Sequence, residues 1–372
     1  MKVAVIGWEL PPAFSGGLGV HTINLFGRLA GSISIDIYVP RMRRLGNSYP
    51  FRVIPVKIRN GILGSPYEIE GFPDFRAAVD DYNLNVLEKF RPEGVSLVHC
   101  HDWITFQAGQ MIKERYGIPL VITFHSTERD RSGNFNPQSS IMDIERRGAL
   151  AADRIIAVSK FTKDEVVRDY GIDPERITVV HNGVDTEHYT VVPREYSLLN
   201  RVLYLGRVTT QKGPRFFVET AALVHEKFPT AHFTMAGTGD QLQNVIDYSR
   251  EIGIKGFIEF TGFVNFRKSV EIYRSSDVFV LPAISEPFGM TVIESMILGT
   301  PVIISKTTGV GEALRNVLRT DYWDTQLMSE YIISILKFGS LRRIMGTMGQ
   351  REASGFTWDK AALETLGVYL SL

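Results

Sequence analysis

The sequence predicts an α/β protein with two doubly wound parallel sheets, and three observations support this fold class. Short apolar runs alternate with segments whose apolar residues recur every three or four positions, the pattern of repeated βαβ units. The alternation stops in a polar stretch near residue 190 and then starts again. The chain has 372 residues, of which 44% are hydrophobic, enough for two separate cores. We therefore expect two similar halves, although no sequence repeat is visible.

The first half, residues 1–190, is expected to contain a mostly parallel sheet. Its apolar runs are continuous, as in strands that helices cover on both faces. The predicted strands span residues 2–7, 34–39, 52–57, 96–100, 120–124, 154–158 and 177–180. The predicted helices span residues 20–30, 75–90, 105–116, 141–151 and 161–170. Loops at the strand ends are where such sheets bind ligands.

The second half, residues 191–355, repeats this alternation. Its predicted strands span residues 202–205, 232–236, 257–260, 278–281 and 302–304, with helices starting near residues 215, 241, 267 and 290. Beyond residue 312 the pattern is helical throughout. The last amphipathic segment, 356–372, is expected to be a helix that could cross back to the first half.

Charge and cysteine content exclude several classes of protein. Lys and Arg number 41, as do Asp and Glu, so no excess of positive charge indicates a nucleic-acid partner. The single cysteine, Cys100, cannot form an intramolecular disulfide. The apolar run at residues 3–6 is too short for a signal peptide or a transmembrane segment. We predict a cytoplasmic protein without a transmembrane segment, and its oligomeric state stays open.

A glycine pair follows the first predicted strand and precedes a helix. Gly16 and Gly17 would let the backbone approach a phosphate, and the helix N-terminus offers unpaired N–H groups. The loop is neither a dinucleotide-binding G-x-G-x-x-G motif nor a Walker motif. A glycine-rich turn without a ligand is the alternative.

Two cations follow the first strand of the second half. Gly206 and Arg207 end that strand, and Lys212 comes five residues after Arg207. A guanidinium and an ammonium on one loop suit the oxygens of a diphosphate leaving group. Two solvated surface cations are the alternative.

The next motif, Ser285 to Ser295, contains two glutamates. Glu286 lies in the predicted loop, and Glu294 falls about one turn into the following helix. Carboxylates accept hydrogen bonds from sugar and ribose hydroxyls, and Gly289 would expose N–H groups at the helix start. Two ordinary surface glutamates are the alternative, but Phe288 would gain nothing as an exposed residue between Pro and Gly.

Two strand ends of the first half predict a sugar pocket. His101, Asp102 and Trp103 end one strand, and His125 and Glu128 follow the next. Aromatic rings stack on sugar CH faces, while His and carboxylate groups bind hydroxyls. The same residue types admit a metal site, but no further ligands cluster in the sequence, so we predict no metal.

Together these motifs resemble the retaining nucleotide-sugar glycosyltransferases of the GT-B architecture, of the glycosyltransferase family 4 type. That family includes glycogen and starch synthase-like enzymes, and the resemblance covers nearly the whole chain. Its most specific element is the pair Glu286 and Glu294, which have seven residues between them. The residues Gly206-Arg207 and Lys212 and the sequence Asn-Gly-Val-Asp at 182–185 support it. The resemblance implies two Rossmann-like domains that face a central cleft.

The resemblance also implies roles for the motif residues. The donor would be a UDP-, ADP- or GDP-hexose, glucose first among them, and the acceptor a carbohydrate, as in glycogen synthase. Arg207 and Lys212 would neutralise the departing diphosphate, Glu286 would bind the donor sugar, and the main-chain carbonyl of His125 would lie beside that sugar. The implied donor-binding set is Gly16, Gly17, Gly206, Gly237, Val264, Phe288, Gly289, Met290, Thr291 and Glu294. The implied acceptor-binding set is His101, Asp102, Trp103 and Glu128.

No metal or other cofactor is required in this architecture, because the cationic side chains stabilise the leaving group. One departure from the family is the stretch 316–324, which is short and atypical and predicts a degraded last strand. Two alternatives stay open. The chain could transfer a sugar to a small sugar or to a lipid-linked or cell-surface glycan, or it could be an inactive sugar-nucleotide-binding protein.

Overall fold

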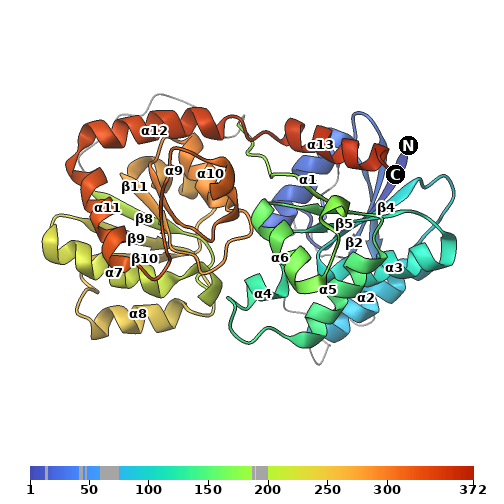
Figure 1. Ribbon diagram of the computed structural model, residues 1–372, viewed down its shortest axis with the longest axis horizontal. Coiled ribbons are helices and arrows are strands. Elements are labelled where there is room, and N and C mark those ends of the chain that lie inside the picture. The colour runs from blue at the N-terminus through green and yellow to red at the C-terminus, as the bar shows by residue number, and fades with distance from the viewer. Residues whose placement is uncertain (13–15, 42–44, 47, 59–74, 187–188, 190–199) are drawn as a thin grey trace. The chain divides into compact units, whose positions relative to one another are not determined.

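The computed structural model describes residues 1–12, 16–41, 45–46, 48–58, 75–186, 189 and 200–372 (Figure 1). The chain divides into two compact units. Unit 1 comprises residues 1–128, 138–183 and 358–372, and unit 2 comprises residues 129–137 and 184–357. The short segment 129–137 therefore belongs to unit 2, although both of its neighbours along the chain belong to unit 1.

The described part of unit 1 contains a parallel sheet of seven strands in the order β3-β2-β1-β4-β5-β6-β7. The strands are β1 (Lys2–Ile6), β2 (Ser34–Pro40), β3 (Arg52–Val56), β4 (Leu97–His101), β5 (Leu120–Phe124), β6 (Arg154–Ala157) and β7 (Ile177–Val179). Every residue of β4 and β5 is buried, as the continuous apolar runs predict. The chain changes direction across the sheet between β1 and β4, which makes their carboxyl ends the natural ligand site.

Helices cover both faces of this sheet (Figure 1). On one face, α1 (Gly17–Leu29) packs against α13 (Trp358–Leu370), and the two helices are also joined by an ion pair between Arg28 and Asp359. The other helices are α2 (Phe75–Lys89), α3 (Trp103–Tyr116), α4 (Glu128–Arg131), α5 (Ser139–Ala151) and α6 (Lys160–Tyr170), with a 3-10 turn at Pro174–Arg176. Gly109 lets α3 approach the sheet, because a Cβ atom there would lie 2.6 Å from Cys100 Sγ.

The described part of unit 2 repeats the design with six parallel strands in the order β10-β9-β8-β11-β12-β13. They are β8 (Arg201–Leu205), β9 (His232–Ala236), β10 (Ile258–Gly262), β11 (Val278–Leu281), β12 (Val302–Ser305) and β13 (Leu318–Thr320). The direction changes between β8 and β11. The two-sheet α/β fold predicted from the sequence is confirmed.

Helices also cover both faces of the second sheet (Figure 1). They are α7 (Pro214–Lys227), α8 (Leu242–Glu251), α9 (Phe266–Ser275), α10 (Met290–Ile297), α11 (Thr325–Lys337) and α12 (Gly339–Ala353), with 3-10 turns at Thr210–Lys212 and Gly309–Ala313. Helix α11 packs on α7, and α12 packs on α10. A buried ion pair between Arg342 and Asp277, at 3.1 Å with both side chains 2% exposed, connects α12 to the start of β11.

Beyond residue 312 the chain is not helical throughout, and the degraded last strand predicted within residues 316–324 is present as a short strand. Residues 318–320 form β13, which pairs in parallel with β12. The strand is only three residues long, too short to give a periodic pattern, and Arg319 in its centre donates to the carbonyl oxygens of Gly311 and Leu314. Among the described helices, none is long and apolar enough to cross a membrane.

Candidate active site

Eight of the ten donor-binding residues implied by the resemblance lie in unit 2, and the other two, Gly16 and Gly17, lie in unit 1. Gly206, Gly237 and Val264 follow the carboxyl ends of β8, β9 and β10, which are neighbouring strands. Glu286 follows β11, and Glu294 lies on α10, one turn from its start. The spacing of the two glutamates along a loop and a helix was predicted correctly, and the edge they share is where an open parallel sheet binds ligands.

The loops after β8 and β11 are held together by backbone contacts. The carbonyl oxygen of Gln211 accepts hydrogen bonds from the N–H groups of Ile284, at 2.9 Å, and Ser285, at 3.3 Å. Gly213 ends the turn with φ +61°, and a Cβ atom there would lie 1.9 Å from the carbonyl oxygen of Pro282. Only glycine permits this approach, which brings Lys212 to the β11 loop.

A second close approach joins the loops after β8 and β9. Gly237 has φ +137°, and a Cβ atom at that position would lie 1.8 Å from the carbonyl oxygen of Gly206. The N–H of Val208 donates to the carbonyl oxygen of Thr238 at 2.8 Å. The hydroxyl of Tyr204 donates to the carbonyl oxygen of Arg207 at 2.9 Å. The backbone that carries the exposed Arg207 side chain is therefore fixed from two sides.

Lys212 and Glu286 form an ion pair in which the ammonium donates to Oε2. Their side chains are only 15% and 9% exposed. The backbone of Glu286 is also fixed, since its N–H donates to Thr307 at 3.0 Å and its carbonyl accepts from Gly309 at 2.7 Å. A cation suited to phosphate and a carboxylate suited to sugar hydroxyls are thus in direct contact.

Glu294 is held by two phenols. The hydroxyl of Tyr273 donates to Glu294 Oε2 at 3.1 Å, and Tyr189 also donates to this carboxylate. Burial raises the pKa of Glu294, and the two hydrogen bonds oppose that shift because they favour the charged form. Neither tyrosine was predicted as a site residue, because Tyr273 lies in an ordinary helix and Tyr189 in a segment without a periodic pattern.

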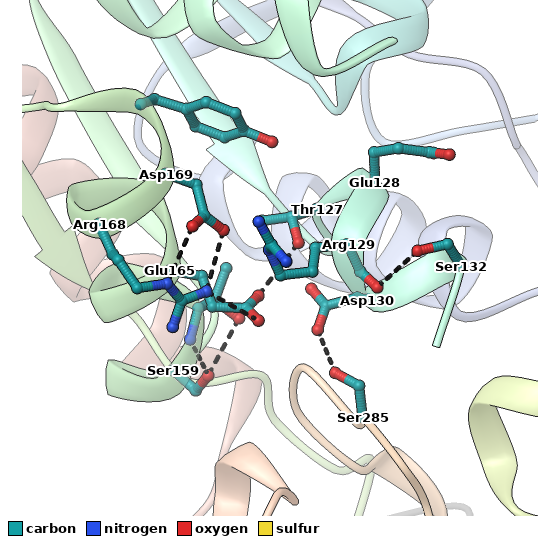
Figure 2. A network of polar contacts seen from close by, with 12 residues as sticks. Thr127, Glu128, Arg129, Asp130, Ser132, Ser159, Glu165, Arg168, Asp169 and Ser285 are labelled. Atoms are coloured by element: carbon teal, nitrogen blue, oxygen red, sulfur yellow. Dashed lines mark hydrogen bonds and ion pairs between the residues drawn. The ribbon is translucent and has the colours of Figure 1, made fainter. Parts of the chain in front are cut away.

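Segment 129–137 supports the same loops. Asp130, which is fully buried, accepts a hydrogen bond from the hydroxyl of Ser285, next to Glu286 (Figure 2). Gly133 has φ +62°, and its side-chain position would lie 3.7 Å from the backbone of Gln211. Asp130 was not predicted as a site residue, and no pattern in the sequence assigns this segment to unit 2.

The remaining residues of the β11 motif start helix α10. Gly289 has φ +110° and precedes Met290 and Thr291, the first residues of the helix. Phe288 is 3% exposed and its ring lies 6.4 Å from that of Phe356. This burial explains a phenylalanine between proline and glycine, since its side chain anchors the loop in the unit 2 core.

In unit 1, the glycine pair begins a helix as predicted. Gly17 is the first residue of α1. However, Glu9 already occupies this helix end, because its Oε2 accepts a hydrogen bond from the N–H of Gly19 at 2.9 Å. A Cβ atom at Gly16 would lie 2.6 Å from the same carboxylate. Glycine at position 16 is therefore required by Glu9, and a diphosphate bound at this helix end would meet a carboxylate. Residues 13–15 of the motif lie outside the described residues.

Asp102 positions the loop that carries His125. Its Oδ1 accepts hydrogen bonds from the N–H groups of His125, at 2.7 Å, and Ser126, at 3.3 Å. Asp102 is 9% exposed and has φ +56°, a backbone conformation that few residues other than glycine adopt. The neighbouring Trp103 is 7% exposed and packs edge-on against Phe75, so its ring lies in the core of unit 1.

The imidazole of His101 is fully buried, and its Nδ1 lies 3.0 Å from His125 Nε2. His21 of α1 joins them, with its ring centroid 4.4 Å from that of His125, and its Nδ1 lies 2.8 Å from Asn182 Oδ1. Burial lowers the pKa of His125 to about 3, and it also lowers the pKa values of His21, His99 and His101. His21 and His99 were not predicted as site residues.

Glu128 has a structural partner on each side. Its Oε1 accepts a hydrogen bond from the N–H of Gln138 at 3.1 Å, and its own N–H donates to Glu145 Oε2 at 3.0 Å. The side chain is 5% exposed. Of the four residues implied to bind the acceptor, none is more than 9% exposed.

Two parallel-sheet Rossmann-like units, with a cation and carboxylate cluster at the strand ends of the second, define a GT-B glycosyltransferase. Residues 15–188 match the family model described as Glycosyltransferase Family 4, and residues 190–352 match the model described as Glycosyl transferases group 1. The chain belongs to glycosyltransferase family 4.

Two curated relatives match over their length. The alpha-maltose-1-phosphate synthase of Mycolicibacterium smegmatis is 29% identical, with 99% of each chain covered. The glycogen synthase of Mycobacterium tuberculosis is 26% identical over 100% of this chain and 95% of its own.

Two solved structures share the fold over the whole of this chain. The sucrose-phosphate synthase from Thermosynechococcus elongatus has a TM-score of 0.82 at 19% identity and is 98% covered. The Anabaena HepE protein in complex with UDP-glucose has a TM-score of 0.76 at 16% identity and is 100% covered.

Proposed function

We propose that the chain is a retaining glycosyltransferase that moves glucose or a related hexose from a nucleotide-diphosphate donor to a hydroxyl of a carbohydrate acceptor. The observation that carries this proposal is the contact between Lys212 and Glu286 at the strand ends of β8 and β11. It combines the two groups that a sugar diphosphate needs, a cation for the leaving phosphate and a carboxylate for the sugar. The named ligand of the Anabaena protein, UDP-glucose, is a donor of this kind.

In this proposal the diphosphate takes the place of Glu286 beside the Lys212 ammonium. Arg207 supplies a second cation from the same loop. Both charges are aimed at the negative charge that develops on the leaving phosphate, which lowers the barrier to transfer. Glu286, released from the ion pair, accepts hydrogen bonds from donor-sugar hydroxyls. These cations make a metal ion unnecessary for the transfer step.

Glu294 would bind the ribose diol. Tyr273 and Tyr189 fill two of the roughly four hydrogen-bonding positions of its carboxylate, which leaves positions for two ribose hydroxyls. In unit 1, Asp102 fixes the backbone of His125, whose main-chain carbonyl would face the donor sugar. We infer a front-face displacement in which the leaving phosphate takes the proton of the acceptor hydroxyl.

The names of two relatives support two kinds of acceptor. The glycogen synthase favours an α-glucan chain, whereas the name of the maltose-1-phosphate synthase favours a small phosphorylated sugar. Because His101, Asp102, Trp103 and Glu128 are buried, the acceptor would be bound by the backbone and side chains that these residues hold in place. We propose that the acceptor is an α-glucan. Transfer to a small sugar or to a lipid-linked glycan, or no transfer at all, are the other outcomes of the test.

The first experiment is a thermal-shift screen of the full chain against UDP-, ADP- and GDP-glucose, with and without EDTA. Stabilisation by one nucleotide family that survives EDTA, and that an Arg207→Ala variant loses, would support the proposal. The selected donor is then incubated with glycogen, maltose or glucose 1-phosphate, and anomeric configuration in the product is read by NMR. An inverted product, or no binding of any donor, would contradict the proposal.

A further inference from the structure

Three histidines from separate elements of unit 1 meet at the carboxyl ends of its central strands. His21 lies on α1, His101 ends β4, and His125 follows β5. One ring nitrogen of each lies within 4.8 Å of those of the other two. His21 and His101 are 5% and 0% exposed, and His125 is the one residue of the three that is not fully buried. We call these three residues the histidine cluster.

Two nitrogens of the histidine cluster have no hydrogen-bond partner among the described residues, although both are shielded from solvent. They are the Nε2 atoms of His21 and His101. The Nδ1 of His21 lies 2.8 Å from Asn182 Oδ1, and an amide oxygen only accepts hydrogen bonds. The proton of His21 is therefore on Nδ1, and its Nε2 carries a free lone pair. A histidine whose other nitrogen donates to an oxygen is the usual form of a metal ligand.

His99 shows the contrast within the same region. Its Nδ1 lies 2.6 Å from the hydroxyl of Tyr369, and its Nε2 lies 2.7 Å from the hydroxyl of Thr123. A buried histidine with a purely structural role is satisfied in this way on both nitrogens. The Nδ1 of His101 shares one proton with Nε2 of His125 across 3.0 Å. With that proton on His101, the Nε2 of His101 also carries a free lone pair.

We propose that His21, His101 and His125 form a binding site for a divalent transition-metal ion such as Zn²⁺, with three imidazole ligands. Imidazole nitrogen suits Zn²⁺, Co²⁺, Ni²⁺ and Cu²⁺, whereas Mg²⁺ and Ca²⁺ require oxygen ligands. Three histidines leave a fourth tetrahedral position for water, and His125 is the partly exposed residue of the three. The ion takes no part in the proposed transfer, which needs no metal, although His101 and His125 are also among the residues implied to bind the two substrates.

Binding requires the rings to rearrange, and the His101 ring must turn, because its Nδ1 and not its free Nε2 faces His125. Zn–N bonds of about 2.0–2.1 Å place neighbouring ligand nitrogens about 3.4 Å apart. The rings must approach from their present separations of up to 4.8 Å, and His125 must exchange its contact with His101 for the ion. The Asp102 carboxylate is not needed as a ligand, since it holds the N–H of His125. The bound ion would connect α1 to the ends of β4 and β5 and stabilise unit 1.

The test uses the full chain after treatment with EDTA and removal of the chelator. Titration with Co²⁺ should give the visible absorption of nitrogen-ligated Co²⁺ and saturate at one ion per chain. Zn²⁺ should displace it and raise the thermal midpoint. His21→Gln and His101→Gln should each weaken binding at least about tenfold, and Asn182→Ala about 10- to 100-fold, as expected for a residue that orients a ligand. His232→Gln, in unit 2, is the matched control and should bind as the wild type does.

Several outcomes would overturn the proposal. One is that each chain binds less than one tenth of an ion. The others are that the His21 and His101 variants keep wild-type affinity, or that the His232 control loses binding. A folded, metal-free melting curve of each variant shows that lost binding is not lost folding. Because no donor is present in this assay, its result is independent of the proposed function.

Discussion

Replacing Lys212 by methionine should lower kcat/KM for transfer by about 10² to 10³, which corresponds to about 2.7–4 kcal/mol of transition-state stabilisation. The magnitude follows from burial. Lys212 and Glu286 are 15% and 9% exposed, so the cation acts on the leaving phosphate through little solvent. The pair of Lys306 with Asp321 is 60% and 33% exposed, and such pairs contribute about 0–1 kcal/mol. Lys306→Met is therefore the matched control and should keep wild-type kinetics.

Stability must be separated from catalysis in this experiment. Lys212→Met leaves the Glu286 carboxylate buried without its cation, which destabilises the fold. The double variant Lys212→Met with Glu286→Gln removes the unpaired charge and should recover most of the thermal midpoint, but none of the activity. Initial rates are measured with the donor selected by the thermal-shift screen. A Lys212→Met enzyme within about threefold of the wild-type kcat/KM would refute the role given to this cation.

Three further substitutions or conditions test other parts of the structure. Gly237→Ala would place a Cβ atom 1.8 Å from the Gly206 carbonyl oxygen. It should destabilise unit 2 by about 1–3 kcal/mol in urea unfolding and weaken nucleotide binding in calorimetry. Unchanged stability and affinity would mean that the loops after β8 and β9 separate freely. Asp277→Asn leaves Arg342 as a buried, unpaired cation and should lower the free energy of urea unfolding by about 3–5 kcal/mol. A decrease below about 1 kcal/mol would mean that water reaches the guanidinium. Burial lowers the pKa of His99, so below about pH 6.5 the unfolded chain binds a proton that the folded chain does not. The free energy of unfolding then falls by up to about 1.4 kcal/mol per pH unit for this group. The wild type should lose more stability between pH 7.5 and 5.5 than His99→Gln does, and equal losses would mean that the pKa of His99 is not lowered in the folded chain.

The fold could be predicted from the sequence because buried parallel strands are continuous apolar runs. The runs at β4 and β5 are buried along their whole length, and the helices between strands have a different period. β13 gave no periodic pattern because it has only three residues, so a degraded strand was all that could be predicted there. The assignment of segment 129–137 to unit 2 depends on contacts such as that of Asp130 with Ser285, which are distant in sequence.

The candidate site was predicted in part, because the sequence does not reveal which of the predicted side chains are buried. A loop after a strand identifies Lys212 and Glu286 as neighbours of a ligand site, because the carboxyl ends of adjacent strands meet at one edge. The same reasoning places Trp103 and Glu128 at the edge of the first sheet, but their side chains turn into the protein. Residue type and position cannot distinguish a side chain that lines a pocket from one that holds the loop beside it.

The loops after β8 and β11 of unit 2 are held together as one rigid unit by backbone contacts. The carbonyl of Gln211 binds the N–H groups of Ile284 and Ser285, and Gly213 lies against the backbone of Pro282. The loops that carry Lys212 and Glu286 therefore cannot separate without breaking backbone contacts, whereas the two side chains can separate. Their charges neutralise each other while the site is empty, which reduces the cost of burying either one. An entering diphosphate would replace the carboxylate beside Lys212, and the released carboxylate is then already in position for the sugar attached to that diphosphate.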